Sequence, residues 1–152
     1  MLRNRSSRVA SVLQYPATRY QTEGPTDLGV ASARERLSAP GLKAFFNIMA
    51  KWKVKDSDAR ALLGGVSNGP FYEMKRNPNR TLDQDRLMRI SYILGIFKAL
   101  QILHGPRLAD EWVQLANRHP IFGGQSPLTY MVRGGLPAMQ TVRRLLDARA
   151  AG

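Results

Sequence analysis

Residues 81–104, with the sequence TLDQDRLMRISYILGIFKALQILH, decide the fold of this chain. Thr81 and Gln84 fit a capping box that would begin a helix, and Gly105-Pro106 would end it. The apolar residues of this helix cover more than one stripe, so it must be covered on several sides, either centrally in the fold or in a dimer interface. They are Leu87, Ile90, Ile93, Leu94, Ile96, Phe97, Leu100 and Leu103.

A second apolar helix precedes this one, starting from Ser38. Its apolar residues recur at three- and four-residue spacing, which indicates one core-facing stripe. That stripe consists of Leu42, Phe45, Phe46, Met49 and Trp52. Three lysines then form a basic connector, which is either a solvated loop or a phosphate contact; they are Lys51, Lys53 and Lys55.

Two short helices are expected between these long ones. The oxygens of Asp56-Ser57-Asp58 can cap the first, and Gly64-Gly65 would end it. Ser67 is a natural N-cap for the second, which would end before Asn77-Pro78-Asn79. Two short helices joined by a glycine turn predict a helix-turn-helix.

The remaining sequence also predicts helices. One is expected from Pro106 to Asn117, another from Ser126-Pro127 to Gly134-Gly135, and a last one from Leu136. No segment of useful length alternates as a strand would. The fold class is therefore predicted to be all-α.

Composition narrows the class of protein. The chain has 152 residues, a net charge of +12 and no cysteine. Without cysteine a disulfide-stapled secreted domain is excluded, which favours the cytoplasm, and no apolar run is long enough to predict a membrane span. The excess of cations favours contact with nucleic acid.

The first 39 residues differ from the rest, because arginines lie among Ser, Ala, Thr and Pro and no acid precedes Glu23. We expect a mobile basic arm at 1–39; a mitochondrial transit peptide has a similar composition. The predicted units that follow are a helix-turn-helix and dimerisation region at 40–104 and a partner-binding domain at 105–152.

The sequence offers little for catalysis. His104 and His119 have no acidic residue at ligand spacing, so no metal site or cofactor is expected. Acidic pairs fall in the first turns of predicted helices, where they complement the helix dipole, and the paired glycines lack any phosphate-binding fingerprint. We therefore predict a binding protein rather than an enzyme.

Several ordered segments resemble one family. They are ALLGGVS at 61–67, LDQDRLMRISYILGIFKAL at 82–100, FGGQSPL at 122–128, then Met131, Gly134-Gly135, Val142-Arg143 and Leu146-Asp147, with Trp112 and Asn117 upstream. Together these residues look like the Xre/MbcA/ParS antitoxins of RES–Xre type II toxin–antitoxin systems, over about residues 40–150.

This resemblance implies an Xre-like helix-turn-helix domain followed by a small helical toxin-binding domain. Such an antitoxin occludes the active site of a RES-domain toxin that consumes NAD, and it binds its own promoter to autoregulate transcription. Carried onto this sequence, the toxin-binding candidates are Trp112, Asn117, Phe122, Gly123, Ser126, Pro127, Met131, Arg133, Gly134, Gly135, Leu136, Arg143, Arg144 and Asp147. Ser126 and Pro127 also fit a helix cap, and Trp112 and Phe122 fit a core equally well.

The DNA-reading unit departs from the pattern at Gly69-Pro70, because a proline side chain cannot hydrogen-bond a base edge. Base contacts are then expected from Ser67, Asn68, Tyr72, Lys75 and Arg76, and phosphate contacts from Lys51, Lys53, Lys55 and Arg80. A helix-turn-helix protein usually works as a dimer, so we expect a homodimer that assembles with toxin into a hetero-oligomer. The alternative function is a stand-alone helix-turn-helix regulator whose C-terminal domain only dimerises or senses a ligand.

Overall fold

A computed structural model describes residues 26–152 of the chain, and all regular structure in that range is helical. The order is α1 (Ala31–Lys51), α2 (Asp56–Leu62), α3 (Asn68–Arg76), α4 (Gln84–His104), α5 (Pro106–Trp112), the 3-10 turn η1 (Pro120–Phe122) and α6 (Pro127–Ala151). The predicted all-helical class is confirmed for this part of the chain. The arginines at positions 3 to 19, on which the basic arm was predicted, lie outside the described residues.

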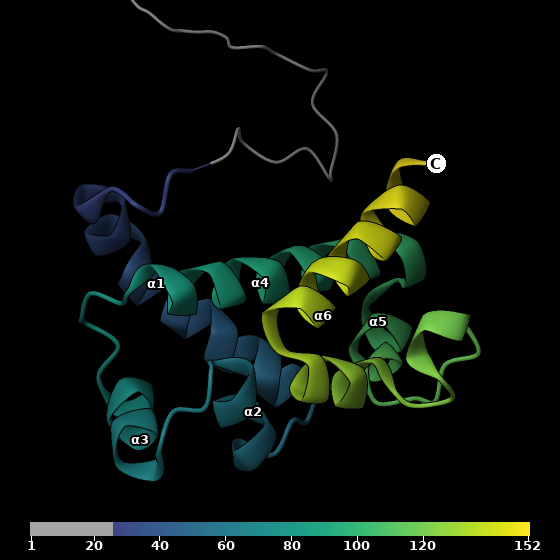
Figure 1. The fold of residues 1–152 in the computed structure, drawn as a ribbon, viewed down its shortest axis with the longest axis horizontal. Coiled ribbons are helices and arrows are strands. Elements are labelled where there is room, and N and C mark those ends of the chain that lie inside the picture. Colours follow the sequence, from purple (N-terminus) through teal and green to yellow (C-terminus); the bar gives the residue numbers. More distant parts are fainter. Residues whose placement is uncertain (1–25) are drawn as a thin grey trace, which may run out of the picture.

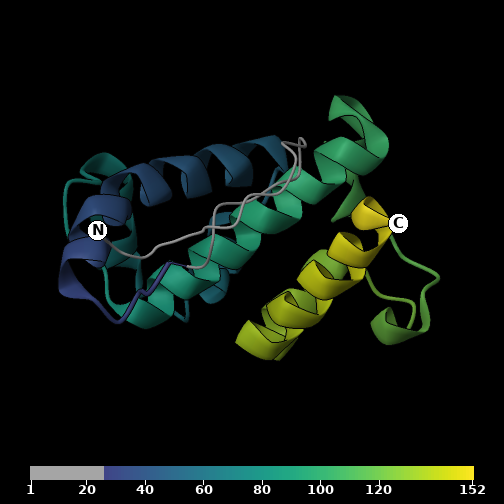
Figure 2. The ribbon, with the colours of Figure 1, turned by 90° about the horizontal axis from the view of Figure 1, so that it is seen from above.

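Helix α4 is the centre of the fold. It packs against α1, α5 and α6, and the two ribbon views show it between α1 and α6 (Figures 1 and 2). Ile93, Ile96 and Leu100 on this helix have no exposed surface. Of the two positions that the sequence left open for α4, the described chain takes the central one. By length and composition α4 would also be apolar enough to cross a membrane, but here it is the core helix that its neighbours cover.

The buried side chains form one hydrophobic cluster that extends from Leu42 in α1 to Leu146 in α6. Figure 1 shows why: α6 crosses α4, while α2 and α3 lie on one side of the long helices. The predicted units 40–104 and 105–152 therefore share a core, because α4 contributes to both. Their boundaries remain a prediction.

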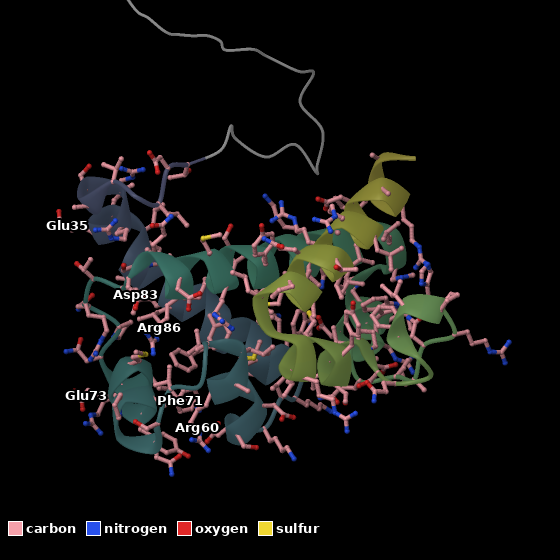
Figure 3. The ribbon with its side chains drawn as sticks, viewed as in Figure 1. Glu35, Arg60, Phe71, Glu73, Asp83 and Arg86 are labelled. Atoms are coloured by element: carbon pink, nitrogen blue, oxygen red, sulfur yellow. The ribbon has the colours of Figure 1, made fainter. Side chains whose placement is uncertain are left out.

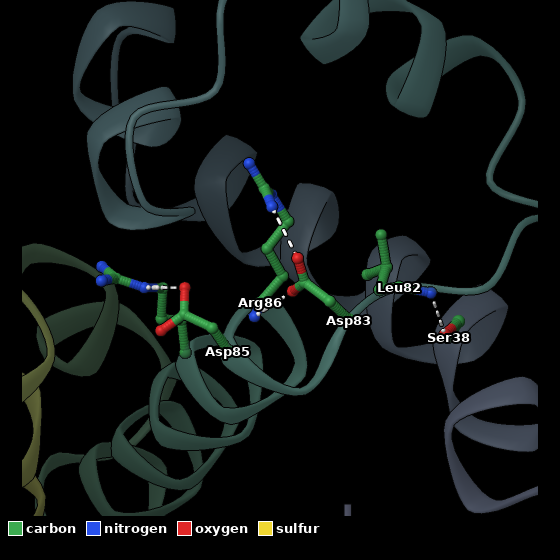
Figure 4. Close-up of polar contacts among 6 residues, drawn as sticks. Ser38, Leu82, Asp83, Asp85 and Arg86 are labelled. Atoms are coloured by element: carbon green, nitrogen blue, oxygen red, sulfur yellow. Dashed lines mark hydrogen bonds and ion pairs between the residues drawn. The ribbon is translucent and has the colours of Figure 1, made fainter. Parts of the chain in front are cut away.

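Helix α1 begins at Ala31, earlier than the expected start near Ser38. Pro40 lies in its interior, although proline normally marks the first turn of a helix because it lacks an amide hydrogen. Ser38 is fully buried nearby; its hydroxyl donates to the Arg34 carbonyl at 2.6 Å and accepts the Leu82 amide at 2.8 Å (Figure 4). Residues 31–39, expected in the arm, thus form the first turns of α1, and Ser38 ties them to the start of α4.

Two predicted side-chain caps are wrong and one is confirmed. Asp83, not Thr81, caps α4: its carboxylate accepts the Arg86 amide at 2.9 Å and also pairs with the Arg86 guanidinium (Figure 4). The N-cap of α2 is Lys55, with no side-chain cap bond. Ser126 does cap α6 by accepting the Thr129 amide at 3.1 Å.

The glycine turns behave as the sequence predicts. Gly64 and Gly65, which end α2, have φ of 97° and 87°, a region that glycine enters without a steric penalty. Gly135 has φ 68° and ψ −149° and divides α6 into two segments at a kink, as the paired glycines suggested. Helix α5 ends at Trp112 rather than Asn117, so the turn that follows it is longer than expected.

Candidate partner and DNA interfaces

The aromatic residues of the C-terminal segment form its core. Phe122 is 2% exposed and meets Trp112 edge to face at a centroid distance of 6.0 Å and Tyr130 at 5.3 Å. Trp112 is itself only 8% exposed, and Met131 is fully buried. These three toxin-binding candidates therefore fill the fold, as aromatic pairs do in protein interiors. They have almost no surface to offer a partner.

The loop before α6 is held by its own polar side chains. The Asn117 carboxamide oxygen accepts the His119 amide at 2.9 Å, and the Asn117 amide donates to the Gln125 carbonyl at 3.2 Å. The Ser126 hydroxyl also donates to the Thr129 hydroxyl. Gly123 is left-handed with φ 57°. Asn117, Ser126 and the buried Pro127 thus shape this loop and start α6, and only Gly123 among these candidates is exposed.

Arg143 and Asp147 lie between α6 and α4 rather than on an open surface. The Arg143 Nε donates to Asp147 Oδ2 at 3.3 Å, and its Nη1 reaches the Ser91 carbonyl on α4 at 3.4 Å. The guanidinium lies directly over Gly95: a Cβ at that position would stand 2.1 Å from Arg143 Nη1. This arginine can occupy the α4–α6 contact only because Gly95 has no side chain.

The electrostatics of the pair agree with this placement. Burial lowers the pKa of Arg143 and raises the pKa of Asp147, because removal from water disfavours the charged form of each. Asp147 Oδ1 is buried with no hydrogen-bond partner in the described part of the chain. Arg143 therefore joins α6 to α4, and its charge is already paired with the partly exposed Asp147.

The other toxin-binding candidates remain accessible to different degrees. Arg133, Gly134 and Arg144 are exposed along α6, and Gly135 and Leu136 are partly exposed at its kink. The two arginines form no salt bridge with the described residues. Exposed, unpaired cations of this kind are able to contact an anionic partner.

Helices α2 and α3 are joined by a glycine turn, and much of the α3 surface is exposed. Phe71 and Met74 anchor α3, and Figure 3 shows Phe71 directed inward and Glu73 at the outer edge. Ser67 and Asn68 are exposed at the start of α3, and no side-chain bond occupies the Ser67 N-cap. Their polar groups are therefore free to meet another molecule.

The remaining candidates on α3 are engaged with carboxylates of the same chain. The Tyr72 hydroxyl donates to Asp56 Oδ2 at 2.7 Å, and Lys75 Nζ lies 3.7 Å from Asp56 Oδ1. Arg76 pairs with Glu73. The bond to Asp56 raises the pKa of Tyr72, since ionisation would place two negative charges side by side. Any contact with DNA must replace these bonds.

The candidate phosphate contacts differ in position. Lys51, Lys53 and Lys55 are exposed around the α1–α2 connection, whereas Arg80 is half-buried and donates through Nε to the Asn77 carbonyl at 3.3 Å. Lys53 has φ 57°, an unusual value for a residue with a side chain. Its amide and that of Val54 bond back to Ala50 and Met49, which is the Schellman arrangement at a helix end.

Sequence reasoning missed the role of three residues that connect the parts of the molecule, although it had named Asp56 as a helix cap. Gln114 Nε2 donates to the carbonyls of Trp52 and Lys53 at 3.0 and 3.2 Å and so fastens the turn after α5 to the end of α1. Asp56 accepts a hydrogen bond from Tyr72 and pairs with Lys75, and Gly95 leaves space for the Arg143 guanidinium. The first two act across long sequence separations and have no local signal. Gly95 stood out only as a glycine within an apolar helix.

Over residues 26–152 the chain is thus an all-helical protein with a short helix pair on one side and a C-terminal segment packed on its central helix. Residues 98–152 match the family described as the antitoxin Xre/MbcA/ParS C-terminal toxin-binding domain. The chain is also 37% identical over 112 residues to the uncharacterized protein y4oB of Sinorhizobium fredii, covering 73% of this chain and 84% of that protein. The C-terminal segment of the chain therefore belongs to the Xre/MbcA/ParS toxin-binding domain family. No solved structure matches the chain.

Proposed function

We propose that this protein is an antitoxin that binds a RES-domain, NAD-consuming toxin and neutralises it by covering the toxin's active site. The observation that carries this proposal is the match of residues 98–152 to a toxin-binding domain. The RES class of the toxin rests on the resemblance of the ordered motifs between residues 61 and 147. In this scheme the toxin holds the catalytic site and the antitoxin is not an enzyme.

We further infer that α2 and α3 form a helix-turn-helix through which the protein binds its own promoter. Their short length, the glycine turn and the exposed Ser67 and Asn68 support this assignment. The lysines around the α1–α2 connection would contact phosphates, and the net charge of +12 favours DNA as a partner. Helix α4 is apolar enough to span a membrane, but α1, α5 and α6 cover it as a core helix, and this supports a cytoplasmic location.

A homodimer would suit a two-fold operator, since paired half-sites need paired reading helices. The buried face of α4 is occupied within the chain, so the dimer would use a different surface. The same dimer would then carry one toxin-binding segment on each protomer. The stand-alone regulator differs in one respect: it would bind its operator without any protein partner.

Co-expression with the product of the adjacent gene tests the proposal. We expect that product to arrest growth and deplete NAD when expressed alone, and the full chain to restore growth and copurify with it. A neighbour that is harmless alone, or one that does not bind the chain, would overturn the antitoxin assignment.

The DNA part has its own test in Asp56→Asn. This change removes a negative charge beside Tyr72 and Lys75, so it should increase affinity for promoter DNA in a gel-shift assay. Arg76→Ala should lower that affinity and relax sequence preference. If neither change alters binding, α3 is not the reading helix.

A further inference from the structure

The exposed apolar side chains of the described chain are unevenly distributed. Five large ones are exposed, and three of them fall between residues 102 and 115, namely Ile102, Leu108 and Leu115 at 36%, 45% and 50%. An exposed aliphatic side chain gains about 25 cal/mol for each Å² that a partner covers. The corner between α4 and α5 therefore carries apolar surface that is not used in the fold.

The surface at this corner also has a depression. A shallow depression of about 420 Å³ is lined by His104, Gly105, Pro106, Arg107, Leu108 and Glu111. It forms because Gly105, with φ 77°, turns the chain sharply between the two helices. Leu108 lines the depression, and the Arg107–Glu111 pair, 3.7 Å apart, also borders it. The Arg107 side chain is 92% exposed, so this pair can open at little cost.

The family match identifies the kind of molecule that would cover this corner. The corner lies inside residues 98–152, the toxin-binding segment. Trp112, Phe122 and Met131 of that segment are buried and cannot supply a contact surface. A partner must therefore meet other residues of the segment, and α5 offers apolar groups among the accessible ones.

The charged residues around this corner indicate what the surface of the partner should carry. Lys98 is exposed one helical turn before Ile102, and His104 and Arg107 are exposed at the depression. Glu111 is the acid at the same depression, and it is already close to Arg107. A complementary partner surface presents an apolar side chain flanked by carboxylates.

We propose that the α4–α5 corner, formed by Ile102, His104, Arg107, Leu108 and Glu111, is the anchor site for the toxin, with Leu108 as its central contact. This assignment rests on the proposed function, since it places the toxin on one face of the toxin-binding segment. The arginines of α6 then contribute electrostatic attraction at the border of the interface.

Leu108→Asp in the full chain tests the assignment. Leu108 lies in the first turn of α5, where a carboxylate complements the helix dipole, so the variant should fold normally. Val30→Asp is the matched control, because Val30 is equally exposed at 46% but lies outside the matched segment. Circular dichroism and thermal unfolding check both variants, and Leu108→Ser repeats the test without an added charge.

The probe is the purified product of the adjacent gene, titrated by calorimetry. We expect Leu108→Asp to weaken binding by about 30-fold or more, as the loss of an interface anchor does, and Val30→Asp to bind like the wild type. Arg107→Glu should weaken binding as well, with a smaller effect at high salt. Wild-type affinity in folded Leu108→Asp and Leu108→Ser would overturn the anchor site alone. Failure of the wild type to bind the probe would instead overturn the proposed function.

Discussion

The α2–α3 pair and the C-terminal segment from α5 to α6 are built on opposite principles. The C-terminal segment encloses an aromatic cluster around Phe122, and its loop is fixed by capping and amide bonds. In the α2–α3 pair, Phe71 and Met74 anchor a short helix whose polar groups remain at the surface. The C-terminal segment is thus defined by its packed interior, whereas the α2–α3 pair is defined by the polar groups that it exposes.

This difference changes the meaning of the family motif. Of its most distinctive residues, Trp112, Phe122 and Met131 are buried in the segment and Ser126 caps α6, so they have a structural role. A motif can therefore identify a toxin-binding domain while its residues lie beneath the binding surface. In the α2–α3 pair the sequence signal is weaker than this motif, but it comes from residues that are accessible to a partner.

The largest contrast between the regions should come from removing an aromatic ring. Phe122→Ala should lower the free energy of unfolding by about 3–5 kcal/mol, because the ring is 2% exposed and its neighbours cannot close the cavity. Tyr72→Ala, at a residue 45% exposed, should cost about 1 kcal/mol or less. Urea unfolding followed by circular dichroism measures both. Equal losses would mean that the two regions are packed alike.

Glycine-to-alanine changes should give an effect of intermediate size in α4 and almost none in α3. Gly95→Ala should destabilise the fold by about 1–2 kcal/mol, because the new Cβ displaces the Arg143 guanidinium from α4. Gly69→Ala in α3 meets no atom within 4 Å outside its chain neighbours, but Pro70 follows it and disfavours helical backbone at a residue with a Cβ. The gain in helix propensity is then offset, and stability should change by less than about 0.5 kcal/mol.

The double variant Gly95→Ala with Arg143→Ala isolates the cause. If the clash is responsible, Gly95→Ala should cost less in the Arg143→Ala background than in the wild type. Thermal unfolding of the four proteins measures this coupling. Additive effects would show that Arg143 does not rest on Gly95.

Helix caps should give a smaller contrast. Ser126→Ala removes a hydroxyl that accepts the Thr129 amide and should cost about 1 kcal/mol. Ser67→Ala removes a hydroxyl with no cap bond and should change stability by less than about 0.5 kcal/mol. Chemical denaturation distinguishes the two, and a larger loss at Ser67 would contradict the contrast.

The smallest effect concerns the ionisation of Tyr72. Asp56→Asn should lower the pKa of Tyr72 toward its ordinary value of 10.0, because a neutral amide replaces the carboxylate whose charge favours the neutral phenol. A raised folded-state pKa contributes stability that is present below the unfolded value and lost as the pH rises through the folded value. Stability of the wild type should therefore fall slightly above about pH 10, and that fall should shrink in the variant. Tyrosinate absorbance, with Tyr72→Phe as the reference, reports the titration.

Much of the fold could be predicted from local signals. Gly64-Gly65, Ser126-Pro127 and Gly134-Gly135 mark real turns and caps, and the apolar surface of α4 correctly indicated a helix covered on several sides. The predicted start of α1 was wrong because the sequence carries no cap signal there. Val30 at the N-cap makes no side-chain bond, and Pro40, which usually marks a first turn, lies in the interior of the helix.

The candidate sites were less predictable, because exposure is a property of the folded chain. Trp112 and Leu108 are both apolar residues of one short helix, yet one is buried and the other is 45% exposed. Likewise, the contacts of Asp56 with α3 and of Gln114 with the end of α1 join residues far apart in sequence. The spacing of residues along the sequence cannot predict contacts of this kind.

Hydrogen exchange on the full chain, with and without the purified product of the adjacent gene, tests most directly the claim that partner binding and DNA reading use separate surfaces. We expect the partner to slow exchange in peptides covering α5 and the start of α6, while peptides covering α3 keep their rates. Protection confined to α3, with none in α5, would contradict the account.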